Sequence, residues 1–300
     1  MNNITYNIAG HTWVVEGDVE KETLRALPGF SIFETPTTVD LHEAPWRLTF
    51  RGDEASHREL TTFWNSCKVL YTFDLEPKTS HCSFGRTAAF YGFTIWDDNP
   101  AIPPIIMRVS PDGMVESTEA SQPQLLKFAL WMAFGLIGAP QGLLPVHSST
   151  IIHNNKAVLF LGESGTGKST HTALWTKHIQ GSQLLNDDSP ILATAATGEP
   201  VVWGSPWSGK THCYHNECAT IAAIVRLSQA PANRIRRLDT LSAFTALHPS
   251  CPPAFAHDSR YTDHVVEIIS KTVDKIPFYH LECLPNEAAA VLCANTIYGC

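Results

Sequence analysis

The stretch AVLFLGESGTGKSTHTALW, residues 157–175, decides how the second half of this chain folds. Its first five residues are apolar and predict a buried strand, which runs directly into a loop that contains Gly162, Gly165 and Gly167. The residues from Lys168 onward predict a helix with Leu174 on its apolar face. A strand, a glycine-rich loop and a helix N-terminus together favour phosphate binding, because backbone N–H groups and the helix dipole both face the anion.

The loop also fits the spacing G-x-x-x-x-G-K-S of a nucleotide-binding P-loop. We expect Lys168 to reach the β- and γ-phosphates of ATP and the Ser169 hydroxyl to ligate Mg²⁺. ATP and Mg²⁺ are therefore the expected cofactors. The residues expected to bind ATP are Gly162, Glu163, Ser164, Gly165, Thr166, Gly167, Lys168, Ser169 and Thr170.

A second segment, WGSPWSGKT at residues 203–211, has the same written pattern. Pro206 has no N–H group to donate, Trp207 is bulky where backbone should surround phosphate, and the following residues form a poor helix. This segment is therefore not expected to bind a nucleotide. It follows a predicted strand, so Lys210 could instead contact the γ-phosphate or the acceptor, with Trp207 as a stacking wall, or the segment could be a surface turn.

Two carboxylates, Asp187 and Asp188, end the apolar strand predicted at residues 182–188. Carboxylates at strand ends beside a phosphate-binding loop suit a metal ligand and a general base, although a turn or helix cap would use the same residue types. His147 precedes the loop and would enter the same sheet from a neighbouring strand, whereas His153 lies in a predicted hairpin and is expected to be structural.

Two domains are predicted. Residues 1–120 show short β-type runs separated by turn residues, which favours a mostly antiparallel β domain. Residues 121–300 begin with a buried helix that ends before Pro140, and strands then alternate with helices, which indicates an α/β P-loop catalytic domain.

Composition excludes several classes of protein. The chain of 300 residues has a net charge of -8 and no Lys/Arg block, so we expect no nucleic-acid partner. The longest apolar run, residues 128–139, is too short to span a bilayer and the N-terminus lacks a signal-peptide pattern, so we expect no membrane partner and a cytoplasmic location. Cysteines lack the CxxC pattern, which favours free thiols, and the spacing of His212, Cys213, His215 and Cys218 is crowded for zinc.

The set VHSSTIIHNNKAVLFLGESGTGKST followed by LLNDD resembles the catalytic domain of the HPr kinase/phosphorylase family, including relatives that phosphorylate peptides. The resemblance spans about residues 120–300 and is strongest over 145–190. It implies that Asp188 is the base that deprotonates the acceptor hydroxyl, that Asp187 lies near the metal, and that His147 orients the pair. It also implies a homo-oligomer. The run LGESGTGKST is similar to the nucleotide core of the ATP-dependent phosphoenolpyruvate carboxykinases, but the metal-binding set of those enzymes is not found.

The sequence departs from the HPr kinase pattern after residue 200, where the motif for protein-substrate contact and phosphorolysis is not recognisable. Glu217 is the nearby candidate for a second metal carboxylate, and Arg226, Arg236 and Arg237 could add a phosphate contact. We therefore expect a kinase that transfers phosphate to a Ser or Thr hydroxyl of a peptide or protein. A small-metabolite kinase and a non-catalytic nucleotide-binding regulatory module are the alternatives.

Overall fold

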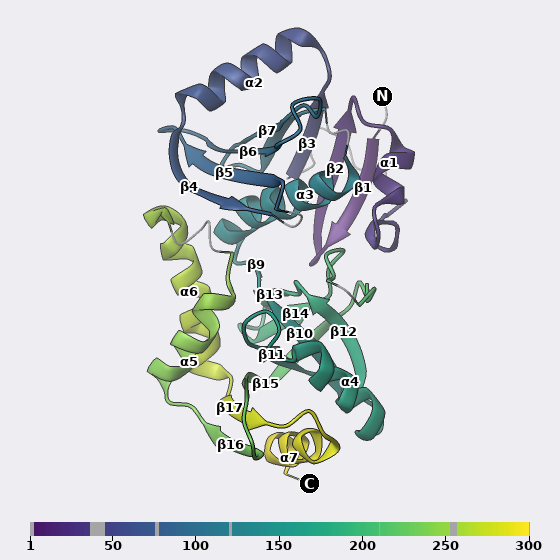
Figure 1. The fold of residues 1–300 in the computed structure, drawn as a ribbon, viewed down its shortest axis with the longest axis vertical. Coiled ribbons are helices and arrows are strands. Elements are labelled where there is room, and N and C mark those ends of the chain that lie inside the picture. Colours follow the sequence, from purple (N-terminus) through teal and green to yellow (C-terminus); the bar gives the residue numbers. More distant parts are fainter. Residues whose placement is uncertain are drawn as a thin grey trace. The chain divides into compact units, whose positions relative to one another are not determined.

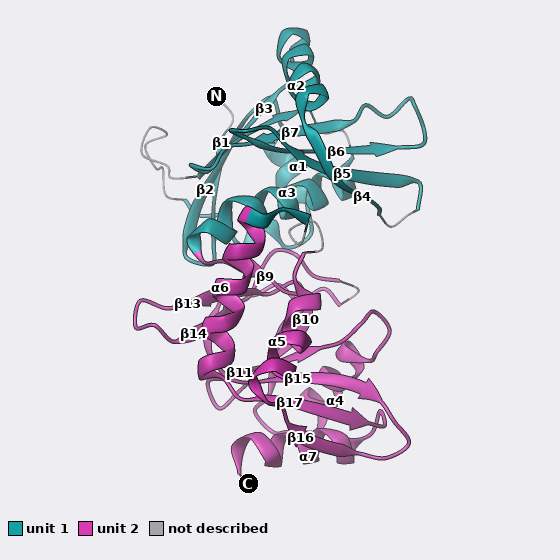
Figure 2. Ribbon diagram, turned by 90° about the vertical axis from the view of Figure 1, so that its left-hand side faces the viewer, with its two compact units in different colours: residues 1–141, 256–259 teal, residues 142–255, 260–300 magenta. Residues whose placement is uncertain are grey.

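The computed structural model of the chain describes residues 3–36, 46–75, 78–119, 122–209, 211–252 and 257–299. The chain forms two compact units, residues 1–141 with 256–259 (unit 1) and residues 142–255 with 260–300 (unit 2), coloured separately in Figure 2. Each unit has its own β-sheet. The chain passes between the units three times, because the short segment 256–259 returns to unit 1.

Unit 1 contains an eight-stranded sheet in the order β1-β2-β3-β8-β7-β6-β5-β4 (Figure 1). Its pairs are antiparallel except β2–β3 and β3–β8, so the predicted, mostly antiparallel sheet is confirmed. Its elements are β1 (Asn3–Ile8), β2 (His11–Gly17), α1 (Lys21–Ala26), β3 (Trp46–Arg51), α2 (Glu54–Ser66), β4 (Lys68–Asp74), β5 (Ser80–Arg86), β6 (Tyr91–Asp97), β7 (Ile105–Val109), β8 (Met114–Thr118) and α3 (Pro123–Gly138).

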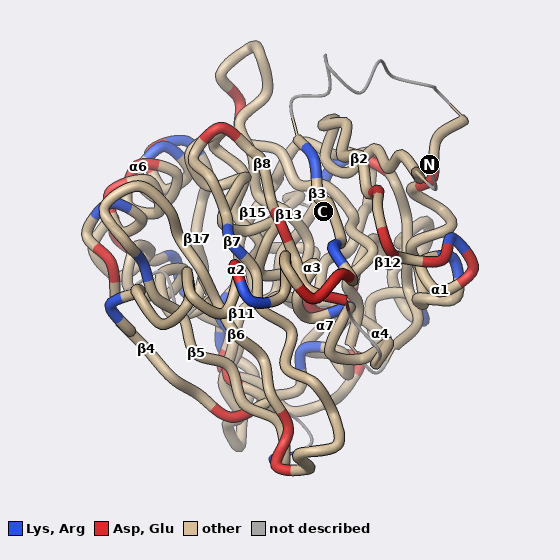
Figure 3. Tube along the Cα trace, turned by 90° about the horizontal axis from the view of Figure 1, so that it is seen from above, with Lys and Arg blue, Asp and Glu red and all other residues tan. Residues whose placement is uncertain are grey.

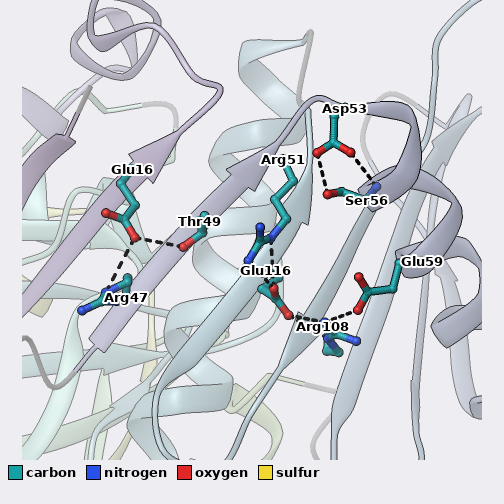
Figure 4. Close-up of polar contacts among 9 residues, drawn as sticks. All are labelled: Glu16, Arg47, Thr49, Arg51, Asp53, Ser56, Glu59, Arg108 and Glu116. Carbon is teal, nitrogen blue, oxygen red and sulfur yellow. Dashed lines mark hydrogen bonds and ion pairs between the residues drawn. The ribbon is translucent and has the colours of Figure 1, made fainter. Parts of the chain in front are cut away.

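Helix α2 was not predicted from the apolar pattern, and polar contacts define its position. Its N-cap is Asp53, whose side chain accepts a hydrogen bond of 2.9 Å from the Ser56 N–H. Arg108 on β7 pairs with Glu59 on α2 at 2.8 Å and also with Glu116 on β8, as Figure 4 shows. Such partly exposed ion pairs contribute at most about 1 kcal/mol each, so they orient α2 over the sheet more than they stabilise it.

Helix α3 was predicted as the first element of the second domain, but it belongs to unit 1. It packs against β6 and β7, and the Phe134 ring lies 6.1 Å from Trp13 and 5.6 Å from Trp46. The division between the units therefore falls after Gln141 rather than after residue 120. The helix is buried on nearly all sides, which explains why its apolar pattern did not indicate which sheet it covers.

Unit 2 contains a nine-stranded sheet in the order β12-β10-β11-β15-β14-β13-β9, and β17 pairs with β15 and β16. The unit is thus an α/β layer structure, as predicted. Its elements are β9 (Leu144–Pro145), β10 (Ser148–His153), β11 (Lys156–Leu161), α4 (Lys168–His178), β12 (Gln183–Asp188), β13 (Ile191–Thr194), β14 (Pro200–Trp203), β15 (Cys218–Gln229), β16 (Arg234–Arg237), α5 (Thr240–Leu247), α6 (Ser259–Lys275), β17 (Phe278–Cys283) and α7 (Glu287–Tyr298).

Helices cover both faces of the unit 2 sheet (Figures 1 and 2). Helices α4 and α7 pack together on one face, where Trp175 of α4 contacts the Phe160 ring of β11 at 5.7 Å. Helices α5 and α6 lie on the other face. Strand β11 has no polar side because it is buried on both faces, and this is the reason its sequence reads as an unbroken apolar run.

Charged residues of both signs are interspersed along the chain, as the trace in Figure 3 shows. Within the described part of the chain, no helix combines the length and apolar composition needed to cross a bilayer.

Candidate active site

The loop of residues 162–167 joins β11 directly to α4, as the sequence predicted. Gly162 has φ of 156° and Gly167 has φ of 107°, conformations that residues with a Cβ rarely adopt. A Cβ added at Gly162 would also lie 3.1 Å from the Thr166 side chain. The glycines thus allow a tight bend that ends at the first turn of α4, whose N–H groups have no acceptors within the helix.

Lys168, the first residue of α4, is a buried cation with 8% of its surface exposed. Its ammonium group donates to the Gly162 carbonyl oxygen at 2.8 Å and to the Glu163 carbonyl oxygen at 3.3 Å. Burial lowers the pKa of Lys168 from its ordinary value, and the negative charges of Asp188 and Asp187 oppose this shift. The cation therefore lies beside the loop and within the field of the two carboxylates.

Strand register brings the other predicted residues to the same edge of the sheet. Strand β10 is antiparallel to both of its neighbours, and Ser148 is paired with Leu161 of β11 on one side and with Asp188 of β12 on the other. His147 immediately precedes this row, and the loop immediately follows it. The histidine, the loop and the carboxylate pair, far apart in sequence, thus meet at one edge.

Asp187 and Asp188 have different neighbours. Asp187 is buried and accepts a hydrogen bond of 3.0 Å from the Ser169 hydroxyl on the α4 face. Asp188 has half of its side chain exposed, and its carboxylate lies 3.6 Å from His147 Nε2. One strand end therefore supplies one carboxylate to the Ser169 hydroxyl and another to His147, and both act on the charge of Lys168.

The backbone of Asp188 is strained. Its φ is 138°, a region that favours glycine, and such strain costs about 1–3 kcal/mol. The neighbouring chain holds this conformation: Ser208 forms a β-bridge with Asp188, and the Gly209 N–H donates to the Asp187 carbonyl oxygen at 2.7 Å. Strain of this kind in a non-glycine residue is typical of functional sites.

A hydrogen bond to the 248–250 turn holds the backbone of His147. The His147 backbone N–H donates to the Ser250 carbonyl oxygen at 2.7 Å. Burial and the charge of Lys168 lower the pKa of the imidazole, while Asp188 and Asp187 oppose the shift. His153, in contrast, lies at the other end of β10, where its ring contacts Tyr298, so it has the structural role that was expected.

The segment GSPWSG, residues 204–209, covers the free edge of β12. No helix follows it among the described residues 211–217, so the segment lacks the architecture of a phosphate-binding loop. Trp207 is buried, and its carbonyl oxygen accepts a hydrogen bond of 3.1 Å from the Asn186 side chain, so the indole is a packing residue rather than the stacking wall that was considered. A Cβ at Gly204 would lie only 1.9 Å from the His215 carbonyl oxygen. The segment thus packs against the end of β12 and stabilises the backbone at Asp187 and Asp188.

Lys210, a further candidate, lies outside the described residues. Glu217 is not brought into this site. Glu217 precedes β15, whose first residues pair with the start of β11 at the end of the sheet opposite the loop, and its carboxylate lies 4.0 Å from His215 Nδ1. Among the described side chains, no group of three His, Cys, Asp or Glu residues is arranged to hold a metal ion, and this includes the His212–Cys218 cluster.

Two cavities flank the loop, one on each face of the sheet. The cavity on the α4 side has a volume of about 670 Å³ and the cavity on the α5 side about 490 Å³. The α4-side cavity is lined by Gly165, Thr166, Gly167, Thr170, His171, Leu174, Leu227, Gln229, Ala230, Cys283, Leu284 and Pro285. The α5-side cavity is lined by His147, Gly162, Glu163, Ser164, Gly165, Thr166, Arg226, Leu227, Ser228, Gln229, Thr245, Ala246, Pro249 and Ser250.

Several lining residues were not predicted from the sequence. Gln229 lines both cavities, and its side-chain amide donates to the Gly165 carbonyl oxygen at 3.2 Å. Strand β15 is parallel to β11, so the residues after Arg226 had to reach the loop. That pairing is a property of the sheet and has no local signal in the sequence, and the η3 turn (His248–Ser250) likewise carries no motif that would have indicated its place beside His147.

Comparison with known proteins gives little further information. No protein-family model matches the chain, and no curated protein matches it. Among solved structures, the chain is similar to the Hpr(Ser) kinase/phosphatase from Coxiella burnetii, with 12% identity over 52% of this chain and 94% of that chain. The TM-score of 0.29 is too low to support conclusions about this chain, so its function is inferred from the geometry of the site.

Proposed function

We propose that this protein is an ATP- and Mg²⁺-dependent phosphotransferase that moves the γ-phosphoryl group to a hydroxyl. One observation carries the proposal: beside a glycine-rich loop that ends at a buried lysine, Asp187 contacts the Ser169 hydroxyl while Asp188 lies next to His147. A protein that only bound a nucleotide would have no use for the half-exposed carboxylate of Asp188 beside His147.

The residues present fit a nucleotide. Lys168 is hydrogen-bonded to loop carbonyl oxygens, and a phosphate oxygen would satisfy the buried ammonium better than these neutral acceptors do. The N–H groups at the start of α4 favour the same anion. The α4-side cavity, with the apolar side chains of Leu174, Leu227 and Leu284, would hold the nucleoside.

The residues present also fit a magnesium ion. The Ser169 hydroxyl and the Asp187 carboxylate already lie 3.0 Å apart, and hard oxygen ligands of this kind are those that Mg²⁺ prefers. When bound, the ion would neutralise charge on the phosphates. Lys168 would do the same for the γ-phosphoryl oxygens from the other side.

Asp188 would accept the proton of the acceptor hydroxyl. The acceptor oxygen forms a bond to the γ-phosphorus, the bond from that phosphorus to the bridging oxygen breaks, and ADP leaves with the electron pair. His147, 3.6 Å from the Asp188 carboxylate, would orient it and limit its access to water. A base of this kind accelerates the reaction by about 10²–10⁴-fold.

The acceptor is a Ser or Thr hydroxyl of a peptide or protein, or the hydroxyl of a small metabolite. The test is mass spectrometry of reactions containing γ-¹⁸O-labelled ATP, Mg²⁺, and a panel of hydroxylated peptides and metabolites. Lys168→Ala removes the phosphate contact, and Thr176→Ala, on the exposed surface of α4, is the matched control. A labelled phospho-product that depends on Lys168 supports the proposal. ATP binding that depends on Lys168, with no transfer to any acceptor and no hydrolysis, would support a regulatory nucleotide-binding module instead.

A further inference from the structure

A single row of paired residues crosses six strands of the unit 2 sheet. The row runs from Asp188 through Ser148 to Leu161, as described for the candidate active site. It continues through Arg226 of β15, which is paired with Leu161. Its last members, paired in turn, are His280 of β17 and Arg236 of β16. Directly paired residues project to the same face of a sheet, so Arg226, His280 and Arg236 share the α5 face. Asp188 lies 3.6 Å from His147, which lines the cavity on that face.

Arg226 occupies the α5-side cavity together with His147. Adjacent strands lie about 4.8 Å apart, so three strand spacings separate the backbone of Arg226 from that of Asp188, about 14 Å in all. Side chains on a strand stand roughly perpendicular to the sheet, so this spacing leaves room for a small organic molecule between the Arg226 and Asp188 positions. A cavity of about 490 Å³ is also within the range of small-molecule sites.

The basic end of the row is electropositive. Within the described residues, no carboxylate forms an ion pair with Arg226, and this arginine is exposed in the cavity. His280 lies between the two arginines: its Nε2 is 2.8 Å from the Ser228 hydroxyl, and its Nδ1 is 3.4 Å from the Arg236 guanidinium. Burial lowers the pKa of His280, and Arg236 and Arg226 lower it further, against the opposing charge of Glu282.

Two acidic residues lie near this end of the row. Glu163 lines the same cavity from the loop, and Glu282 follows His280 on the same face of β17. Glu282 is paired in register with Ser228 on one side and with Arg234 on the other, so a further arginine lies beside it on β16. Among the described ion pairs, neither Glu163 nor Glu282 is joined to Arg226, so the cavity keeps the positive charge of this arginine.

We infer that the α5-side cavity binds a hydroxyl acceptor that also carries an anionic group, a carboxylate or a phosphate. The acceptor hydroxyl lies at His147 and Asp188, and the anionic group lies at Arg226. An arginine suits this role because its planar guanidinium binds either anion through two parallel hydrogen bonds. This inference rests on the proposed function, since it names the chemical class of the acceptor for the same reaction.

The test compares related acceptors with and without an anionic group. Three matched pairs are used: glycerate with glycerol, glycerol phosphate with glycerol, and a peptide ending in serine with a free or an amidated carboxylate. We expect kcat/KM to be higher for the charged member of at least one pair. The pair that shows this difference identifies whether the anionic group is a metabolite carboxylate, a phosphate or a peptide carboxylate. Arg226→Gln should reduce this preference roughly 10- to 100-fold, the range for a hydrogen bond to a charged group.

Two variants serve as controls. Arg226→Lys keeps the charge and should retain part of the preference. Arg237→Gln removes a cation from the opposite face of β16, since Arg237 pairs with Tyr279 rather than with His280, and should leave the preference intact. Equal transfer to charged and neutral acceptors by the wild-type protein would overturn the inference and leave the proposed function standing. An equal loss for both acceptors in Arg226→Gln would also overturn it, because it would assign Arg226 to the nucleotide phosphate.

A binding measurement separates this inference from the proposed function. Titration calorimetry of glycerate and glycerol phosphate is carried out with ATP absent, in wild type and in Arg226→Gln. Binding that requires Arg226, in a protein that transfers phosphate to none of the acceptors, would keep the anion site and refute the kinase. No binding of either anion, combined with no charge preference in transfer, would refute the anion site itself.

Discussion

Replacing Asp188 should separate the role of its carboxylate in activity from the role of its backbone in stability. The carboxylate lies 3.6 Å from His147, and the backbone has φ of 138°, which glycine adopts without strain. We expect Asp188→Gly, Asp188→Ala and Asp188→Asn all to lose phosphoryl transfer by about 10²–10⁴-fold, which corresponds to about 3–5 kcal/mol of activation free energy. All three should still bind ATP, because Lys168 and the loop are unchanged.

The three variants should differ in their free energy of unfolding. Relief of strain contributes about 1–3 kcal/mol to Asp188→Gly, and the greater freedom of glycine in the unfolded chain opposes this by about 0.5–1 kcal/mol. Asp188→Gly should therefore be more stable than Asp188→Ala, by up to about 2.5 kcal/mol, because the Ala variant keeps the strain and neither variant has the carboxylate.

Urea unfolding followed by tryptophan fluorescence measures the stability difference, and labelled ATP measures transfer. The comparison of Gly with Ala isolates the backbone, because neither variant has a carboxylate. A Gly variant no more stable than the Ala variant would refute the strain argument. Transfer by the Asn variant at the wild-type rate would refute the assignment of Asp188 as the base.

Three further predictions follow from the same contacts. Asp187→Asn should raise the Mg²⁺ concentration required for half-maximal transfer at least about tenfold with little change in folding, and a Mg²⁺ titration that matches wild type would exclude Asp187 as a metal ligand. Gly204→Ala should lower the free energy of unfolding by about 1–3 kcal/mol or more, because its Cβ would overlap the His215 carbonyl oxygen, and wild-type stability in urea would contradict this packing. His11 stacks on Trp46, and burial lowers the pKa of its imidazole in the folded protein. The unfolded chain therefore binds a proton more readily than the folded protein does. The free energy of unfolding should be retained above about pH 6.5 and should decrease as the pH falls below that value. His11→Phe should lose less stability than wild type between about pH 7.5 and about pH 5.5, and equal losses would show that His11 does not contribute.

Local patterns predicted much of unit 2. The apolar run 157–161 became β11, the glycine-rich loop turned where expected, and α4 began at Lys168. These features depend on neighbouring residues only, through burial of a strand, glycine at positive φ and the start of a helix. Residues 203–209 are not followed by a helix among the described residues 211–217, as the sequence after Gly209 indicated.

Other features could not be predicted from patterns. Helix α3 lies in unit 1 because Phe134 packs against Trp13 and Trp46, which are about 90 to 120 residues away in sequence. The position of Glu217 at the end of the sheet opposite the loop depends on the parallel pairing of β15 with β11, which joins segments about 65 residues apart. Such long-range pairing has no signature in a single stretch of sequence.

The sequence by itself therefore determined the chemistry available to the site: a loop with free N–H groups, a lysine, a serine and two adjacent carboxylates. Only the tertiary structure decided which of these side chains lie next to one another. The antiparallel pairing of β10 places His147 beside Asp188, Asp187 contacts Ser169 instead, and the parallel pairing of β15 places Arg226 in the cavity that His147 lines. The physical reason is that side-chain direction in a strand is local, whereas the identity of the neighbouring strand is set by burial of the whole sheet between its helices.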